Sequence, residues 1–228
     1  MQNFLKFYIK ASTKYNLQSP FLHHFIKSCI DNKDQYYAYQ YIRQWAGNKI
    51  AFENPGKIIH KMVNFLQPQL TLVVGKEFTL SWYAKLADTR KPVIFIWSGD
   101  KMASPLMKMR HLADSPEIEV GAIEELTSII ESNQKVFLIV EDMNGIIQEF
   151  LEKRIPGELN KLVIFLVRKH RNKHIERFWS HLSSSNLKGL FVDFYTSGIY
   201  FRLPELSSEK IAYIPYPLKP WKIGLFGK

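Results

Sequence analysis

The stretch Gln69–Ala87 constrains the fold of this chain more than any other. It reads QLTLVVGKEFTLSWYAKLA: aliphatic and β-branched residues, a single glycine (Gly75), a short loop and then an amphipathic helix. A buried strand that runs through a glycine into a helix is typical of open α/β sheets, where ligands bind beyond the carboxyl ends of the strands. The sequence therefore predicts such a sheet, with a ligand site next to Gly75.

Strand and helix patterns alternate from Gln69 onwards. Apolar runs such as KVFLIV and KLVIFLV are typical of central strands buried on both faces, and Thr196-Ser197-Gly198 between the last two strands predicts an antiparallel hairpin. We therefore predict a doubly wound α/β fold whose mostly parallel sheet has seven strands, with the first in its middle. The expected strands are 70–74, 93–97, 118–121, 136–141, 162–168, 190–195 and 199–203, and the helices between them are 79–86, 105–112, 124–131, 145–153 and 174–182.

The chain divides into three parts. Residues 1–67 predict a helical extension packed on the core, in which Ser19 caps a helix that Pro20 begins. Residues 68–206 form the predicted α/β domain, and residues 207–228, which contain three prolines, predict an extended arm. The aromatic run 36–45 has two interpretations: a packed seam between helices, which we favour, or a surface that stacks bases.

The net charge is +10, which suggests an anionic partner: nucleic acid, a phosphorylated small molecule or an anionic membrane surface. A basic surface without a specific partner is an equally good interpretation. The one cysteine, Cys29, cannot form an internal disulfide, so we expect the protein to reside in a reducing cytoplasm. We expect Cys29 itself to be a small apolar residue of the core. No stretch approaches the roughly 18 apolar residues of a membrane span, and no signal peptide is expected.

Five stretches together resemble a known family. They are Gln18-Ser19-Pro20-Phe21, VNFLQPQLTLVVG, IFIWSGD, VFLIVED and DFYTSGIYFR, which extend over most of the chain from Ser19 to Arg202. Their order resembles the class I S-adenosylmethionine-dependent methyltransferases, and more narrowly a bacterial O-methyltransferase-like group with a helical N-terminal extension. The likeness lies in the layout and not in any single motif. It implies a Rossmann-like methyltransferase fold and, as a function, methyl transfer.

The resemblance also implies a cofactor cleft, from which this sequence departs. The family's first loop resembles E-x-G-x-x-x-G, whereas Val73 takes the acidic position here and Phe78 brings a bulky side chain into the loop. Trp97 stands where the family has an acidic residue for the ribose. S-adenosylmethionine is therefore expected to bind weakly or not at all. The residues that would line the cleft are Gly75, Lys76, Glu77, Trp97, Ser98, Ala122 and Glu124.

Charged residues follow the fourth and fifth predicted strands. By the resemblance, Glu141 or Asp142 would serve as a catalytic base or an orienting group. These carboxylates could hold a divalent cation, but a run of fixed positive charges after the fifth strand would repel one. We therefore expect no metal and an anion-binding cluster, although a solvated basic turn is the other interpretation. The cluster consists of Arg168, Lys169, Arg171 and Lys173.

Two functions remain open from the sequence. The first is a methyltransferase-like protein, an O-methyltransferase relative with weakened or lost cofactor binding. The alternative is a non-catalytic protein of the same fold that binds a phosphorylated ligand or nucleic acid through its basic residues. A dimer is compatible with both functions.

Overall fold

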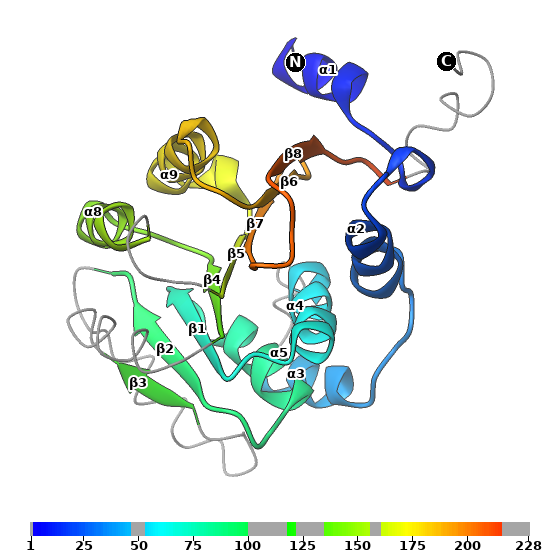
Figure 1. Cartoon of the computed structure of the whole chain (residues 1–228). Coiled ribbons are helices and arrows are strands. Elements are labelled where there is room, and N and C mark those ends of the chain that lie inside the picture. Colours follow the sequence, from blue (N-terminus) through cyan, green and yellow to red (C-terminus); the bar gives the residue numbers. More distant parts are fainter. Residues whose placement is uncertain (1, 47–52, 100–117, 122–134, 156–160, 216–228) are drawn as a thin grey trace.

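An eight-stranded sheet organises the structure, a computed structural model that describes residues 2–46, 53–99, 118–121, 135–155 and 161–215 (Figure 1). The strand order is β3-β2-β1-β4-β5-β7-β6-β8, and the first five strands in the chain run parallel. The predicted doubly wound α/β sheet with a central first strand and an antiparallel hairpin is confirmed. The strands are β1 (Leu70–Gly75), β2 (Val93–Trp97), β3 (Glu119–Gly121), β4 (Val136–Val140), β5 (Leu162–Leu166), β6 (Leu190–Asp193), β7 (Gly198–Arg202) and β8 (Glu209–Ala212).

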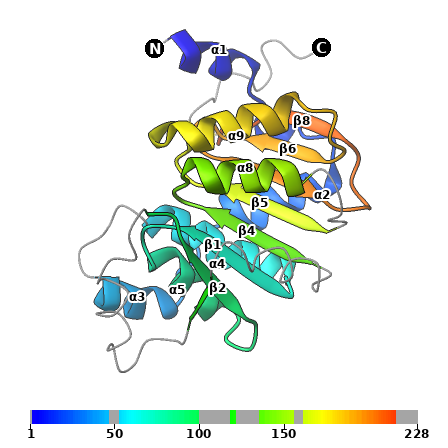
Figure 2. The same cartoon turned by 90° about the vertical axis from the view of Figure 1, so that its left-hand side faces the viewer.

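Helices cover both faces of the sheet. Figure 2 shows α8 and α9 lying over one face, and α4 and α5 lie on the other. The predicted helices 105–112 and 124–131 lie outside the described residues. The described α-helices are α1 (Gln2–Lys10), α2 (Pro20–Phe25), α3 (Ala38–Ala46), α4 (Glu53–Leu66), α5 (Thr79–Ala87), α8 (Gly145–Arg154) and α9 (Lys173–Ser184).

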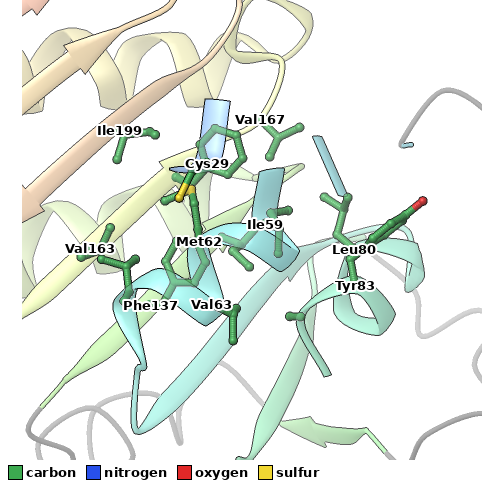
Figure 3. Close-up of a cluster of buried hydrophobic side chains, with 14 of the residues drawn as sticks. Cys29, Ile59, Met62, Val63, Leu80, Tyr83, Phe137, Val163, Val167 and Ile199 are labelled. Atoms are coloured by element: carbon green, nitrogen blue, oxygen red, sulfur yellow. The ribbon is translucent and has the colours of Figure 1, made fainter. Parts of the chain in front are cut away.

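The core has two halves because neighbouring residues of a strand point to opposite faces of the sheet. Val73 faces the layer of α4 and α5, whereas Leu72 and Val74 face the layer of α8 and α9. Figure 3 shows the first layer, where Cys29 and Met62 pack beside Phe137. Cys29 is buried, and burial raises the pKa of its thiol to about 12, so the thiol is an unreactive core group.

The N-terminal extension contains α1 to α4, and Ser12 between α1 and α2 pairs with the sheet edge. Ser19 Oγ accepts a hydrogen bond from Leu22 N, as its position before Pro20 predicted. In the aromatic run, Tyr39 is buried against His60 and Tyr83, whereas Tyr37 is exposed. Tyr39 therefore belongs to the packed seam that we favoured. None of the helices within the described ranges is both long and apolar enough to cross a membrane.

The described part of the predicted extended arm, residues 207–215, lies along the edge of the sheet. Four of its residues form β8, which pairs in parallel with β6 at the sheet edge. At the end of β8, Ser12 N donates to Ala212 O, and Ile214 N donates to Ser12 O. The segment around Ser12 therefore also joins this edge. An exposed strand edge carries unpaired backbone groups, and this pairing satisfies them.

Candidate functional site

The parallel strands end together and place their following residues on one edge of the sheet. Gly75 is paired with Trp97 across β1 and β2, and Val140 is paired with both Val74 and Leu166. We call the residues that follow these carboxyl ends the rim. Ligands of open α/β sheets bind at this edge. The rim is therefore the candidate functional site of this fold.

Asp142 accepts hydrogen bonds from three neighbouring loops. Its Oδ2 lies 2.8 Å from Ser98 Oγ after β2 and 2.9 Å from Lys76 Nζ after β1. Its Oδ1 accepts from Asn172 Nδ2, after β5, at 2.7 Å. Partial burial alone would raise the pKa of Asp142, but these three donors hold it below its usual value. Asp142 is therefore an ionised group that ties the loops together.

Two asparagines cap helices and cross-link the rim at the same time. Asn172 Oδ1 accepts from His174 N at 2.8 Å and caps α9, while its amide nitrogen also donates to Met143 O. Asn144 Oδ1 caps α8, and its Nδ2 donates to Ser98 O at 3.1 Å. The sequence analysis singled out neither residue. An asparagine directly before a helix is a recognisable N-cap signal, but its second contact depends on the fold.

Glu141 lies over the loop that follows β1. Its Oε2 accepts a hydrogen bond from Lys76 N at 3.0 Å, and a Cβ on Gly75 would lie only 2.6 Å from that oxygen. Gly75 therefore makes room for the carboxyl group. Burial raises the pKa of Glu141, the nearby Asp142 and Glu77 add to this, and the Lys76 N–H opposes it. Such a carboxyl group is a better proton acceptor than an ordinary glutamate.

Aromatic side chains fill the space beside the first loop. The ring of Phe78 stacks on Phe95 with centroids 4.2 Å apart, and Phe78 is buried. Trp97 ends β2 half-buried, with its indole nitrogen close to Gly99. Of the predicted cleft residues, Gly75, Lys76, Trp97 and Ser98 thus lie on the rim, and Glu77 follows Lys76. Ala122 and Glu124 lie outside the described residues.

The predicted basic cluster is divided in two. Lys169 is only 3% exposed, and its Nζ lies 2.6 Å from Asp193 Oδ1 and 5.2 Å from the centre of the Trp179 ring. This differs from the predicted anion-binding role, because the ammonium group already has a carboxylate partner. Arg171 and Lys173 are exposed, and Arg168 is half-buried. The side chains available to an outside anion are therefore those of Arg171 and Lys173, with Arg168 beside them.

Arg168 begins the basic turn in a left-handed backbone conformation, with φ at 53°. Burial lowers the pKa of its guanidinium group, the positive charge of Arg171 lowers it further, and Glu141 opposes both effects. The charges of Arg171 and Glu141 thus act on Arg168 in opposite directions. A second negative charge at this place would be stabilised electrostatically.

No group of three or more histidine, cysteine or acidic residues in the described parts of the chain could hold a metal ion. The two histidines among the basic residues after β5 have different hydrogen-bond partners. His170 Nδ1 lies 2.9 Å from Glu176 Oε1, and His174 Nδ1 lies 2.9 Å from Gln148 Oε1. At the rim, the Lys76 ammonium group supplies a positive charge beside Asp142. Lys76 Nζ thus forms an ion pair with Asp142, whereas Glu141 accepts from the backbone N–H of Lys76.

Comparisons with known proteins found similar structures but no similar sequences. No protein-family model matches the chain, and no curated protein sequence matches it significantly. A SAH-bound methyltransferase from Podospora anserina is 11% identical, with a TM-score of 0.49 over 82% of this chain and 96% of that one. An O-methyltransferase from Bacillus cereus in complex with SAH is 16% identical, with a TM-score of 0.46 over 79% and 96%. A putative caffeoyl-CoA O-methyltransferase from Staphylococcus aureus is 10% identical, with a TM-score of 0.49 over 79% and 96%.

The strand arrangement of this chain decides its fold class, because those identities and TM-scores are low. A mostly parallel sheet with β1 in its middle, an antiparallel β7 and helices on both faces is the arrangement that the resemblance implied. This chain has the Rossmann-like methyltransferase fold. Relative to the sheet expected for that methyltransferase fold, β8 is an additional edge strand.

Proposed function

We propose that this chain uses its methyltransferase fold to bind an anionic, phosphate-bearing ligand at the rim. One observation carries the proposal: Arg168, Arg171 and Lys173 follow directly after β5 at the rim, and the side chains of Arg171 and Lys173 are exposed. Guanidinium groups match the geometry of phosphate oxygens, and several cations together raise the local concentration of anions. Asp142 does not cancel this charge, because Lys76, Ser98 and Asn172 already engage it.

The proposal includes weak or absent binding of S-adenosylmethionine. The backbone N–H of Lys76 donates to Glu141, and the Ser98 hydroxyl donates to Asp142. Phe78 and Phe95 stack beside the same loop. A ligand that needs bare backbone beside β1 would have to displace these contacts, at the cost of the hydrogen bonds and the stacking. These contacts support weak or absent cofactor binding, and isothermal titration calorimetry with S-adenosylmethionine measures it.

The anion site is tested with Arg168→Gln, Arg171→Gln and Lys173→Gln combined in one variant. We expect it to lose affinity for a fluorescent single-stranded oligonucleotide, measured by anisotropy over a salt series. For single strands the slope of log affinity against log salt is about 0.7 per phosphate neutralised, so three cations contribute about 2. Inorganic phosphate, used as a competitor, distinguishes a small-anion site from one that needs a polymer.

The matched control changes three basic residues at the opposite edge of the sheet, Arg154, Lys161 and Lys188, to glutamine. These residues are exposed, and the control removes the same formal charge. It should keep most of the affinity and the salt slope of the wild type. Equal losses in the two variants would mean that the oligonucleotide responds only to net charge, and the rim proposal would then be wrong.

A second candidate is methyl transfer from S-adenosylmethionine, with Glu141 as the proton acceptor. The observation that favours it is the raised pKa of Glu141 at the carboxyl end of β4, where burial is the largest cause. Isothermal titration calorimetry with S-adenosylmethionine decides between the candidates. A micromolar dissociation constant that Gly75→Ala abolishes would show that the cofactor binds beside this loop, which would favour methyl transfer and contradict weak cofactor binding.

A further inference from the structure

The helix α1 presents apolar side chains to the solvent. Leu5 is 60% exposed and Ile9 is 62% exposed, and they lie one helical turn apart on the same side. Figures 1 and 2 show α1 at one end of the molecule, outside the layers that cover the sheet. Single exposed apolar residues are common, but two in adjacent turns of a short terminal helix form a continuous apolar stripe.

A different side of α1 holds the helix to the protein. The rings of Phe4 and Phe7 contact Tyr195, with centroid distances of 4.9 Å and 5.4 Å. At the end of the helix, Ala11 is fully buried and Ser12 pairs with the edge of the sheet. At 100° per residue, Leu5 and Ile9 lie on the opposite side from Phe7. The stripe therefore faces outward while α1 is anchored.

Lysines border the apolar stripe. Lys6 and Lys10 each follow a stripe residue and are exposed. The first thirty residues of the chain contain four lysines and no acidic residue. A helix with apolar residues on one side and lysines on the next is typical of segments that lie in the interface of an anionic lipid bilayer.

The basic turn of the rim continues this surface. Tyr195, which α1 contacts, also lies 4.9 Å from His170, the residue between Lys169 and Arg171. Arg171, which follows His170 directly in the chain, is exposed and adds positive charge beside this contact. Anionic phospholipids attract such charges within about a Debye length, roughly 8 Å at physiological salt.

We propose that α1 docks this protein on the surface of an anionic membrane, with Leu5 and Ile9 in the headgroup region and Lys6 and Lys10 on lipid phosphates. This interaction surface is centred on α1, outside the ligand site of the rim, and it shares with that site only the charge of Arg171. A single short helix gives weak binding, so both the apolar and the basic contributions are needed. Binding should therefore depend on anionic lipid and fall with salt.

The charge of α1 favours a membrane over a second copy of this chain. A two-fold symmetric contact through the stripe would place identical surfaces face to face. Lys6 and Lys10 of one copy would then approach the same lysines of the other, and like charges repel. An anionic bilayer instead complements them.

Vesicle co-sedimentation tests the proposal with the full chain. We expect binding to phosphatidylcholine vesicles that contain about one third phosphatidylglycerol, and much weaker binding to phosphatidylcholine alone. The variant Leu5→Glu/Ile9→Glu should lose at least about tenfold in vesicle affinity, because two apolar side chains no longer leave water. Ile146→Glu is the matched control, since Ile146 is 69% exposed on α8, and it should bind as the wild type does.

Three results would overturn the proposal. The first is failure of the wild type to bind anionic vesicles, and the second is unchanged binding by Leu5→Glu/Ile9→Glu. The third is a dimer in light scattering that this double variant converts to a monomer, which would assign the stripe to a second copy. Thermal unfolding of all the variants, which should match the wild type because the changed residues are exposed, separates lost docking from lost folding.

Discussion

The ammonium group of Lys76 lies 2.9 Å from Asp142 Oδ2 and joins the loop after β1 to the end of β4. These two residues follow β1 and β4, two neighbouring inner strands that pair in parallel from Leu70 to Val74. Ser98 and Asn172 bring the loops after β2 and β5 to the same carboxylate. A lysine and an aspartate thus stabilise the edge of the sheet where this fold binds its ligands.

Asp142→Asn should lower the free energy of unfolding by about 1–3 kcal/mol at neutral pH, because hydrogen bonds to a charged acceptor are lost. The folded protein holds the pKa of Asp142 below its usual value, so the stabilisation exists above the unfolded pKa of about 3.9. It disappears as the pH falls through the folded pKa. Urea denaturation of both proteins from pH 7 down to pH 3 measures the difference.

The control for that series is Glu149→Gln, which breaks an exposed pair with Lys153 within α8. Exposed pairs contribute little, so we expect no measurable change in stability at any pH. If Asp142→Asn changed the free energy of unfolding as little as the control does, the contacts of Asp142 with Lys76, Ser98 and Asn172 would not stabilise the protein.

Asn172→Ala should lower the free energy of unfolding by about 1–2 kcal/mol, because α9 loses its cap. Asn172→Ser keeps an acceptor for the cap, but its shorter side chain lacks the amide nitrogen that donates to Asp142. Asn172→Ser should therefore recover the part of the unfolding free energy that the cap contributes. The remaining difference from the wild type then measures the contact with Asp142. Chemical denaturation of the three proteins measures both parts, and identical stabilities for the alanine and serine variants would contradict the capping role.

Gly75→Ala should destabilise the protein by about 1–3 kcal/mol, because its Cβ would lie 2.6 Å from Glu141 Oε2. The cost should shrink when Glu141→Ala is also present, since the crowded carboxyl group is then removed. A double-mutant cycle measures this coupling. Gly145→Ala is the control, because its Cβ would meet His174 at an ordinary 3.6 Å. Additive effects of Gly75→Ala and Glu141→Ala would show that Glu141 does not lie over Gly75.

Lys169→Met should lower the free energy of unfolding by about 1–3 kcal/mol, because Asp193 loses its cation in a partly buried place. Trp179 Nε1 and Tyr195 N would remain as its donors. Lys173→Met, at the exposed first residue of α9, should change stability little. Thermal and chemical unfolding compare the two. A neutral effect of Lys169→Met would mean that the lysine is not the partner that Asp193 needs.

The repeated β–α pattern was readable because it depends on local residues. The run LTLVVG is apolar on both faces, and a strand with that pattern is stable only inside a sheet covered by two layers. The cap at Ser19 was readable for the same reason, since an N-cap and its helix are adjacent in the chain. The strand β8 was not predicted, because EKIA has no buried face and forms a strand only where the edge of β6 is open.

The sequence by itself determined the doubly wound sheet, the central place of β1 and the gathering of Gly75, Glu141 and Arg168 on one rim. Only the tertiary structure decided which charged groups meet there. Lys169 and Arg171 are two residues apart, yet Lys169 is buried against Asp193 and Arg171 is exposed. Asp142 takes its partners from loops that follow three different strands. Apolar patterns repeat along a strand and can be read locally, whereas an ion pair depends on the distance between groups that the fold brings together.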